Sequence, residues 1–221
     1  RFDKGISVIK FQYSNGYRTP NLDDVGKVFD SEPGNLIIPN PNLKPEIANN
    51  FEINYEVSSK KILIKNAIYY INLKNAITRS LTRFNNQDSI MYDGTLSRVQ
   101  TLTNTGKANV YGFSNKISYF ISKKIIVINT ISYNYSNDII NKKPLRHSPP
   151  LFGKFEISYK TKNIELIYNL IYNGKKSIEN FADSELNKLY LYTKDGSPSW
   201  KTHNISIIYN INYFIKANFS V

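Results

Sequence analysis

The residues best suited to binding chemistry lie in two proline-rich stretches. Arg18 and Glu46 flank the first stretch, and a guanidinium can either pair with such a carboxylate or meet an anionic ligand. Arg146 and His147 lie in the second, where an imidazole can bind iron or a carboxylate ligand. A histidine in a loop is also commonly just solvated, so two interpretations of His147 stay open.

Catalysis has no supporting pattern in this sequence. Cysteine is absent, which excludes thiolate metal sites, cysteine nucleophiles and disulfides. Asp23, Asp24, Asp30 and Glu32 form an acidic cluster, but they lack the regular spacing of a calcium-binding loop. Serine, histidine and aspartate residues occur in loops, and no spacing pairs them. We therefore predict no catalytic residues, no metal site and no cofactor.

Strands must position the binding groups, because apolar and polar residues alternate along most of the chain. The clearest case is residues 50–57, where Phe51, Ile53 and Tyr55 alternate with polar neighbours and so face one side of a strand. The same period predicts nine strands, at about residues 5–14, 50–57, 61–75, 108–122, 125–135, 151–159, 164–172, 200–211 and 214–221. The register of 61–75 is not assigned, because Lys65 and Asn66 blur its two faces.

The connections between these strands alternate between short and long. Tight turns are predicted near residues 59, 123, 162 and 212, and long loops around 30, 93, 144 and 187. We expect the first long loop to be neither strand nor long helix, because its prolines fix φ and remove backbone donors. Residues 80–107 read as a polar loop, and 174–199 as a loop with one or two helical turns.

This arrangement indicates an all-β, antiparallel transmembrane barrel. Strands of about nine to eleven residues cross a bilayer when tilted, and such barrels have short turns on one side and long loops on the other. The longest apolar run, residues 67–71, is far too short for a membrane-spanning helix. A soluble β-sandwich is the alternative, because alternation alone does not separate a lipid-facing side from a packed core.

The formal charge of +12 raises the possibility of nucleic-acid binding, since basic grooves with aromatic residues bind phosphates and bases. Many lysines instead occur in pairs at the tight turns, such as Lys60 and Lys61 or Lys123 and Lys124. They do not follow one face of the chain. We therefore predict no nucleic-acid partner.

Two short motifs carry a family resemblance. Tyr17-Arg18-Thr19-Pro20-Asn21, followed by Asn40-Pro41-Asn42-Leu43-Lys44-Pro45-Glu46, resembles the paired FRAP-like and NPxLKPE boxes of TonB-dependent outer-membrane receptors, in a Bacteroidetes-like form. Further similarity lies at residues 108–112, 149–153 and 198–200. The resemblance implies a barrel of 22 strands around an N-terminal plug. Residues 1–221 then form a partial barrel domain of about nine strands, without the plug.

The resemblance also implies a function. Such receptors actively import a scarce nutrient, such as an iron-siderophore, haem or cobalamin complex, across the outer membrane of a Gram-negative bacterium. The implied partners are outer-membrane lipid, the plug of the same protein, the TonB system acting through that plug, and an unknown nutrient. A passive porin-like barrel is the main alternative and an outer-membrane enzyme the other. A plug and coupling box encoded upstream would favour the receptor.

The boxes and the second loop supply the residues expected to contact ligand or plug: Tyr17, Arg18, Pro20, Asn21, Asn40, Asn42, Lys44, Glu46, Arg146 and His147. The alternative is that the polar members only hydrogen-bond the loop into place, since buried polar groups need partners. In related haem receptors a histidine between the boxes ligates iron. None lies between Pro20 and Asn40 here, and the second histidine of the chain, His203, is expected in the barrel wall.

The predicted faces can be tested by placing arginine on each of them. Arginine at Ile53, Tyr55, Ile157 or Tyr168 should impair insertion of the full-length protein, at a cost of about 2–4 kcal/mol near the bilayer midplane. Arginine at the control positions Asn54 or Ser158 should be tolerated, as measured by the yield of folded protein in the membrane fraction. Equal behaviour of both sets would refute the assignment of faces.

Overall fold

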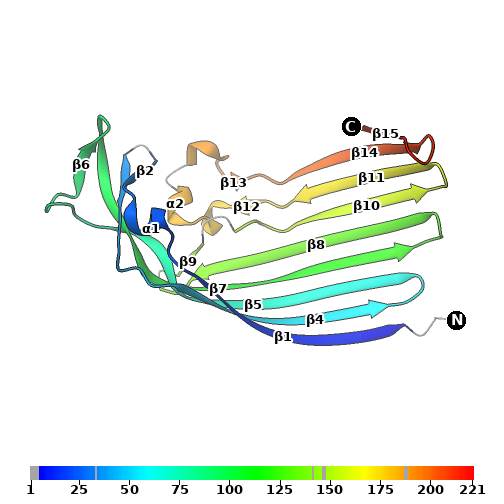
Figure 1. Cartoon of the computed structure of the whole chain (residues 1–221), viewed down its shortest axis with the longest axis horizontal. Helices are drawn as coiled ribbons and strands as arrows, with labels where there is room; N and C mark the ends of the chain where they lie inside the picture. The colour runs from blue at the N-terminus through cyan, green and yellow to red at the C-terminus, as the bar shows by residue number, and fades with distance from the viewer. Residues whose placement is uncertain (1–4, 33, 141, 146–147, 187–188) are drawn as a thin grey trace.

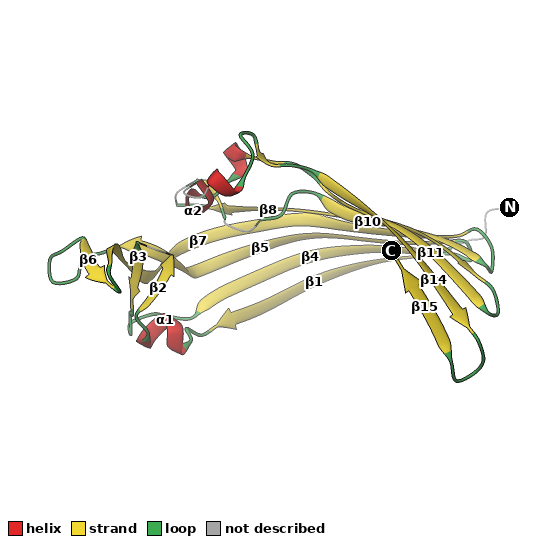
Figure 2. Cartoon of the chain, turned by 90° about the horizontal axis from the view of Figure 1, so that it is seen from above, coloured by secondary structure: helices red, strands yellow, loops and turns green. Residues whose placement is uncertain are grey.

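The computed structural model describes residues 5–221 except 33, 141, 146–147 and 187–188. Nine strands of this described part lie side by side in chain order: β1 (Ile6–Arg18), β4 (Glu46–Ser58), β5 (Ile62–Leu81), β7 (Thr95–Phe120), β8 (Ile125–Asp138), β10 (Phe152–Lys160), β11 (Ile164–Asn173), β14 (Trp200–Asn210) and β15 (Lys216–Ser220). Each is antiparallel to the next. The prediction of nine antiparallel strands is confirmed, and β1 and β15 form the two margins of a curved, open sheet (Figures 1 and 2).

The two ends of this sheet differ as the sequence predicted. The four short connections, at residues 59–61, 121–124, 161–163 and 211–215, lie at one end, and the long connections lie at the other (Figure 1). The long connections contain the short strands β2 (Phe29–Glu32), β3 (Asn35–Ile38), β6 (Ser89–Tyr92), β9 (Lys143–Pro144), β12 (Lys176–Ser177) and β13 (Gly196–Ser197). They also contain α1 (Leu22–Gly26), α2 (Asp183–Leu186), η1 (Ile178–Asn180) and η2 (Leu189–Leu191). No helix in the described ranges is long and apolar enough to span a membrane.

Two loop predictions were wrong. The first long connection contains a short hairpin, because β2 pairs with β3, and β3 then pairs in parallel with β7 from Asn35 opposite Arg98 to Ile38 opposite Thr101. Most of residues 80–107 is also strand, because β5 and β7 continue past the wall and β6 pairs with β7. The polar composition of residues 80–107 predicted a loop. Backbone hydrogen bonds between strands do not require apolar side chains, so these polar residues can still form strands. The helical turn predicted after Asp183 is confirmed by α2.

The alternating faces of the wall are confirmed by its register. Phe11, Ile53 and Ile68 lie opposite one another on adjacent strands, so they share one face, and all three are exposed. Asn54 lies on the other face, opposite Lys10 and Ala67.

Asn66 explains why the register of β5 was hard to read. It faces the apolar side, opposite Tyr55 and Asn115, where the Asn115 amide nitrogen donates to its side-chain oxygen at 2.5 Å. This bond gives the Asn66 oxygen a donor and one Asn115 N–H an acceptor.

The best-packed side chains lie beyond the wall. Leu36, Ile37 and Val99 are almost fully buried where β3 lies against β7. A single sheet buries neither face by itself, so packed side chains occur where further segments cover it. The β2–β3 hairpin does so on the extended β5–β7 strands, and Phe181 and Ala182 are buried in the connection at residues 174–199. Figure 2 shows the β5–β7 extension at the opposite end from the tight turns.

Gly112 leaves room for a tyrosine ring on the polar face. It lies opposite Tyr69, and a Cβ at Gly112 would come within 2.6 Å of the Tyr69 hydroxyl and 2.3 Å of the Tyr133 carbonyl oxygen. The latter atom belongs to the neighbouring backbone and cannot move without disturbing the ladder. Gly16 also lies in a strand, yet a Cβ there would meet nothing within 4 Å.

Gly112→Ala should therefore lower the free energy of unfolding of the full-length protein by about 1–3 kcal/mol, because overpacking displaces backbone. Gly16→Ala should be neutral or stabilising by up to ~1 kcal/mol, since alanine restricts the unfolded chain. Urea unfolding in detergent micelles measures both values. Similar losses of unfolding free energy at the two positions would contradict the explanation that the Tyr69 ring and the Tyr133 carbonyl leave no room for a side chain at position 112.

Candidate functional site

The two predicted boxes meet at one ionic junction. The register of β1 and β4 places Arg18 directly opposite Glu46, and the Arg18 Nε donates to Glu46 Oε2. A second guanidinium nitrogen, Nη1, lies 3.0 Å from Asp24 Oδ2. The Glu46 and Asp24 side chains are only 15% exposed, whereas Arg18 is half exposed. One cation therefore joins the end of β1, helix α1 and the start of β4.

Glu46 also supports an irregularity in β5. The β5–β7 register shifts on both sides of Ala76, and the Ile77 N–H donates to Glu46 Oε1 at 2.7 Å. A bulge leaves backbone groups outside the regular ladder, and the carboxylate provides the missing acceptor. The box residue Glu46 thus binds both Arg18 and the backbone of the neighbouring wall strand.

Asn21 is used as a helix cap. Its side-chain oxygen accepts from the Asp24 N–H at 2.9 Å, and the Asp24 carboxylate accepts from the Asn21 N–H at 3.0 Å. This reciprocal pair starts α1. The sequence prediction missed Asp24 as a member of the junction, although an Asn three residues before an Asp is a recognisable cap signal.

The second box is fastened to β7. The Asn40 side-chain amide donates to the Leu102 carbonyl at 2.8 Å, and its oxygen accepts from the Asn42 N–H at 3.0 Å. Asn104 accepts from the Lys44 N–H at 2.6 Å and donates to the carbonyls of Lys44 and Asn75. Asn104 was missed as well, because no local pattern links two residues that are 60 positions apart.

The remaining predicted residues are Tyr17, Pro20, Arg146 and His147. Tyr17 is 76% exposed, and its side chain and that of Arg18 line a shallow recess of about 280 Å³ with Glu46. Pro20 is half-buried beside the junction residues in sequence and has no side-chain donor or acceptor. Arg146 and His147 lie outside the described residues. The polar box residues are therefore engaged in anchoring the loop, and their contact with a ligand or plug stays a prediction.

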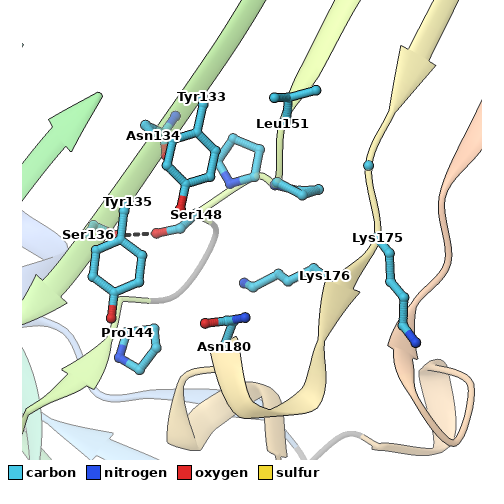
Figure 3. A pocket seen from close by; sticks show the side chains of 13 residues that line it. Tyr133, Asn134, Tyr135, Ser136, Pro144, Ser148, Leu151, Lys175, Lys176 and Asn180 are labelled. Carbon is cyan, nitrogen blue, oxygen red and sulfur yellow. Dashed lines mark hydrogen bonds between the residues drawn. The ribbon is translucent and has the colours of Figure 1, made fainter. Parts of the chain in front are cut away.

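A second cavity lies among the long connections. β10 begins at Phe152, opposite Ser132, so the end of β8 beyond that point has no β10 partner. Residues 148–151 and 174–180 enclose the space left there, a cavity of about 200 Å³ (Figure 3). Its lining combines rings, amides and hydroxyls: Tyr133, Asn134, Tyr135, Ser136, Pro144, Ser148, Pro149, Pro150, Leu151, Gly174, Lys175, Lys176 and Asn180.

A buried ion pair holds one side of this cavity. The Lys176 ammonium lies 3.0 Å from Glu185 Oε2, and the two side chains are only 10% and 9% exposed. The same carboxylate oxygen accepts from the Ala182 N–H at 2.9 Å, and the ammonium lies 5.3 Å from the centre of the Phe181 ring. Removing one partner of such a pair leaves an uncompensated buried charge, so the pair fixes residues 176–185 firmly.

The opposite side of the cavity is formed by β8. A Ser136–Ser148 hydrogen bond ties β8 to the proline segment (Figure 3). Tyr133 and Tyr135 lie on the other face of β8, the apolar face of the wall, where their ring centroids lie 6.3 Å and 5.4 Å from those of Phe113 and Tyr111. Lys175 points away from the other side chains, toward Asp195, whose carboxylate is 3.8 Å from its ammonium. The cavity therefore offers neutral hydrogen-bonding groups. Among the described residues, no group of three histidine, cysteine or acidic side chains is placed to hold a metal ion.

The anchoring role of Glu46 can be measured by hydrogen exchange. Glu46→Ala leaves the Ile77 N–H without its acceptor, which costs about 1–3 kcal/mol for a buried donor. We expect exchange at Ile77 and across residues 19–45 to accelerate by about tenfold or more. Asp23→Ala, which removes only an exposed pair with Lys27, should leave both unchanged. Unchanged exchange in Glu46→Ala would show that the junction does not hold the loop.

Comparisons with known proteins give a consistent assignment. The model of a family described as TonB dependent receptor-like, beta-barrel, matches residues 1–221. A search of curated proteins gave no match. Among solved structures, the siderophore receptor PirA from Acinetobacter baumannii is similar with a TM-score of 0.75 and 17% identity, over 100% of this chain and 35% of that chain.

Two further structures are similar to the same extent. A mutant of the ferric enterobactin receptor PfeA from Pseudomonas aeruginosa has a TM-score of 0.75 and 15% identity, over 100% of this chain and 33% of that chain. The copper transporter OprC has a TM-score of 0.73 and 13% identity, over 97% of this chain and 30% of that chain. At these identities the structures show a common fold, and the chain spans about a third of their length. Because the family model covers its full length, the chain belongs to the TonB-dependent receptor family, as a fragment of the β-barrel.

Proposed function

We propose that residues 1–221 form one partial barrel domain, part of the wall and extracellular loops of a receptor that actively imports a scarce nutrient. The observation that carries this proposal is the family match along the whole sheet, whose nine strands have short turns at one end and long connections at the other. Members of this family lie in the outer membrane of Gram-negative bacteria, and this chain does too.

The two faces of the wall suit the proposed partners. The exposed apolar side chains of Phe11, Ile53 and Ile68 fit contact with lipid tails. The other face carries a shallow polar recess of about 240 Å³ lined by residues such as Asn54, Lys65, Lys116 and Thr130. Such a face fits a hydrated interior filled by the plug of the same protein, through which the TonB system would act.

The cavity beside Tyr135 is our candidate for nutrient capture. It lies among the long connections, which are extracellular in barrels of this kind. Amides and hydroxyls around a recess fit an organic molecule with several polar groups. We therefore propose a metal chelate, such as an iron-siderophore, haem or cobalamin complex, as the nutrient. The similarity in fold to a siderophore receptor and a ferric enterobactin receptor agrees with this class.

Uptake measurements on the full-length receptor test the function. A strain lacking the receptor should lose energy-dependent uptake of one labelled complex from a panel of ferric siderophores, haem and cobalamin. Depleting TonB should abolish the same uptake. Uptake that persists without TonB would favour the passive porin-like alternative, and turnover of a lipid or peptide substrate would favour an enzyme.

Binding measurements test the cavity separately. Asn134→Ala and Asn180→Ala should each weaken binding of the transported complex at least about fivefold, since an interface contact of this kind contributes roughly 1 kcal/mol. Asn210→Ala is the control, because Asn210 lies at the tight-turn end of the wall. Unchanged affinity in both cavity variants, with uptake intact, would move the capture site elsewhere without altering the transport proposal.

A further inference from the structure

The four tight turns of the wall share one kind of side-chain to backbone hydrogen bond. The first residue of each turn, Ser59, Ser122, Thr161 or Asn212, accepts a hydrogen bond from the N–H three residues later, at 3.0–3.1 Å. The side-chain oxygen thereby satisfies a backbone donor that the turn would otherwise expose. The side chains between these positions do not take part in that bond.

These turns share an unusual charge. Residues 58–62, 121–125, 160–164 and 210–216 contain no acidic residue but seven lysines: Lys60, Lys61, Lys123, Lys124, Lys160, Lys162 and Lys216, which we name the lysine rim. Lys61, Lys123, Lys124 and Lys162 are exposed. Lys160 pairs with Glu165 at 3.3 Å. Most acidic residues of the chain lie at the other end, among them Asp23, Asp24, Asp88 and Asp195.

The sheet places these turns in a row. Successive turns are two strands apart, or about 10 Å at the usual strand spacing. This separation is close to the Debye length at physiological salt, about 8 Å, so the fields of neighbouring turns overlap. The turns line one end of the wall (Figure 1), so we expect the rim to give that end a positive potential.

The last turn adds a second observation. Tyr213 and Phe214 are 95% and 90% exposed, and their ring centroids lie 5.3 Å apart. Adjacent exposed rings are unfavourable in water, whereas aromatic side chains are enriched at the headgroup level of a membrane. Lysines beside such rings extend their ammonium groups toward the headgroups.

We propose that the lysine rim binds anionic phospholipid headgroups of the periplasmic leaflet. The orientation follows from the family, whose short turns face the periplasm. Clustered lysines next to a bilayer are attracted to phosphate-bearing, negatively charged lipid, and aromatic neighbours set the depth of the turns. The inference concerns the anchoring of the wall and is independent of which nutrient is transported.

Lipid selectivity of the full-length receptor tests the proposal. The receptor is placed in phosphatidylcholine bilayers that contain traces of spin-labelled phosphatidylglycerol or spin-labelled phosphatidylcholine, and electron paramagnetic resonance measures the motionally restricted fraction of each. We expect phosphatidylglycerol to associate roughly threefold better at low salt. The preference should fall in about 0.5 M salt, which screens charge.

Matched variants test whether the rim lysines cause the preference for phosphatidylglycerol. Replacing Lys61, Lys123, Lys124 and Lys162 by glutamine should reduce the preference by at least half, while the corresponding arginine variant should retain it. The control replaces Lys27, Lys142 and Lys194, three exposed lysines of the long connections, and Lys107, an exposed lysine of β7 far from its tight turn, by glutamine and should keep the preference. Heat-modifiable gel migration verifies that every variant is folded.

Several outcomes would overturn the proposal. Equal association of the two lipids with the unmodified receptor would do so. A phosphatidylglycerol preference that survives in the glutamine variant would also do so, as would an equal loss of this preference in the control variant. Sedimentation with purified peptidoglycan that depends on the rim lysines, without any lipid preference, would assign the rim to the cell wall instead. Loss of nutrient uptake in these variants bears on the transport proposal and leaves the lipid measurement unaffected.

Discussion

The structure depends on the need of every backbone N–H and C=O group for a hydrogen-bond partner inside a membrane. A bilayer supplies no water to such groups, so a strand there must pair on both sides. The nine strands meet this need by antiparallel pairing with their sequence neighbours. In the described part of the chain, the outer edges of β1 and β15, the start of β14 and residues 133–136 of β8 have no strand partner on one side. In a barrel of this family, further strands close the edges of β1 and β15, which explains why this sheet is curved but not closed.

The same requirement explains the loop anchors. Where β5 departs from its regular register at residues 75–77, side chains supply the hydrogen bonds that a neighbouring strand would otherwise make. Glu46 accepts from the Ile77 N–H, and Asn104 donates to the Asn75 carbonyl. Both side chains also hold the box residues, through Arg18 and Lys44. The irregular point of the wall is thus where the first long connection is fixed, and the packed core of Leu36 and Val99 forms just beyond it.

The polar box residues illustrate how a sequence motif can have a structural use. Asn21, Asn40 and Glu46 each bind backbone groups of their own loop or of the adjacent strand. These contacts shape the loop whatever the transported nutrient is. Our proposal places nutrient capture elsewhere, in the cavity between β8 and residues 174–180, where the buried Lys176–Glu185 pair lies.

The sequence by itself determined the nine wall strands, the faces of all but the third, and the position of the short turns, because alternation and turn residues act over neighbouring positions. Ile53 and Asn54 had to face opposite sides whatever the rest of the chain did. It also predicted a pairing of Arg18 with Glu46 as one of several options. Only the tertiary structure decided what joins residues far apart: the β2–β3 hairpin on β7, the bond between Lys44 and Asn104, the bond from Asn115 to Asn66, and the cavity beside Tyr135. These features depend on register shifts and strand ends, which place polar groups opposite partners that no local pattern specifies.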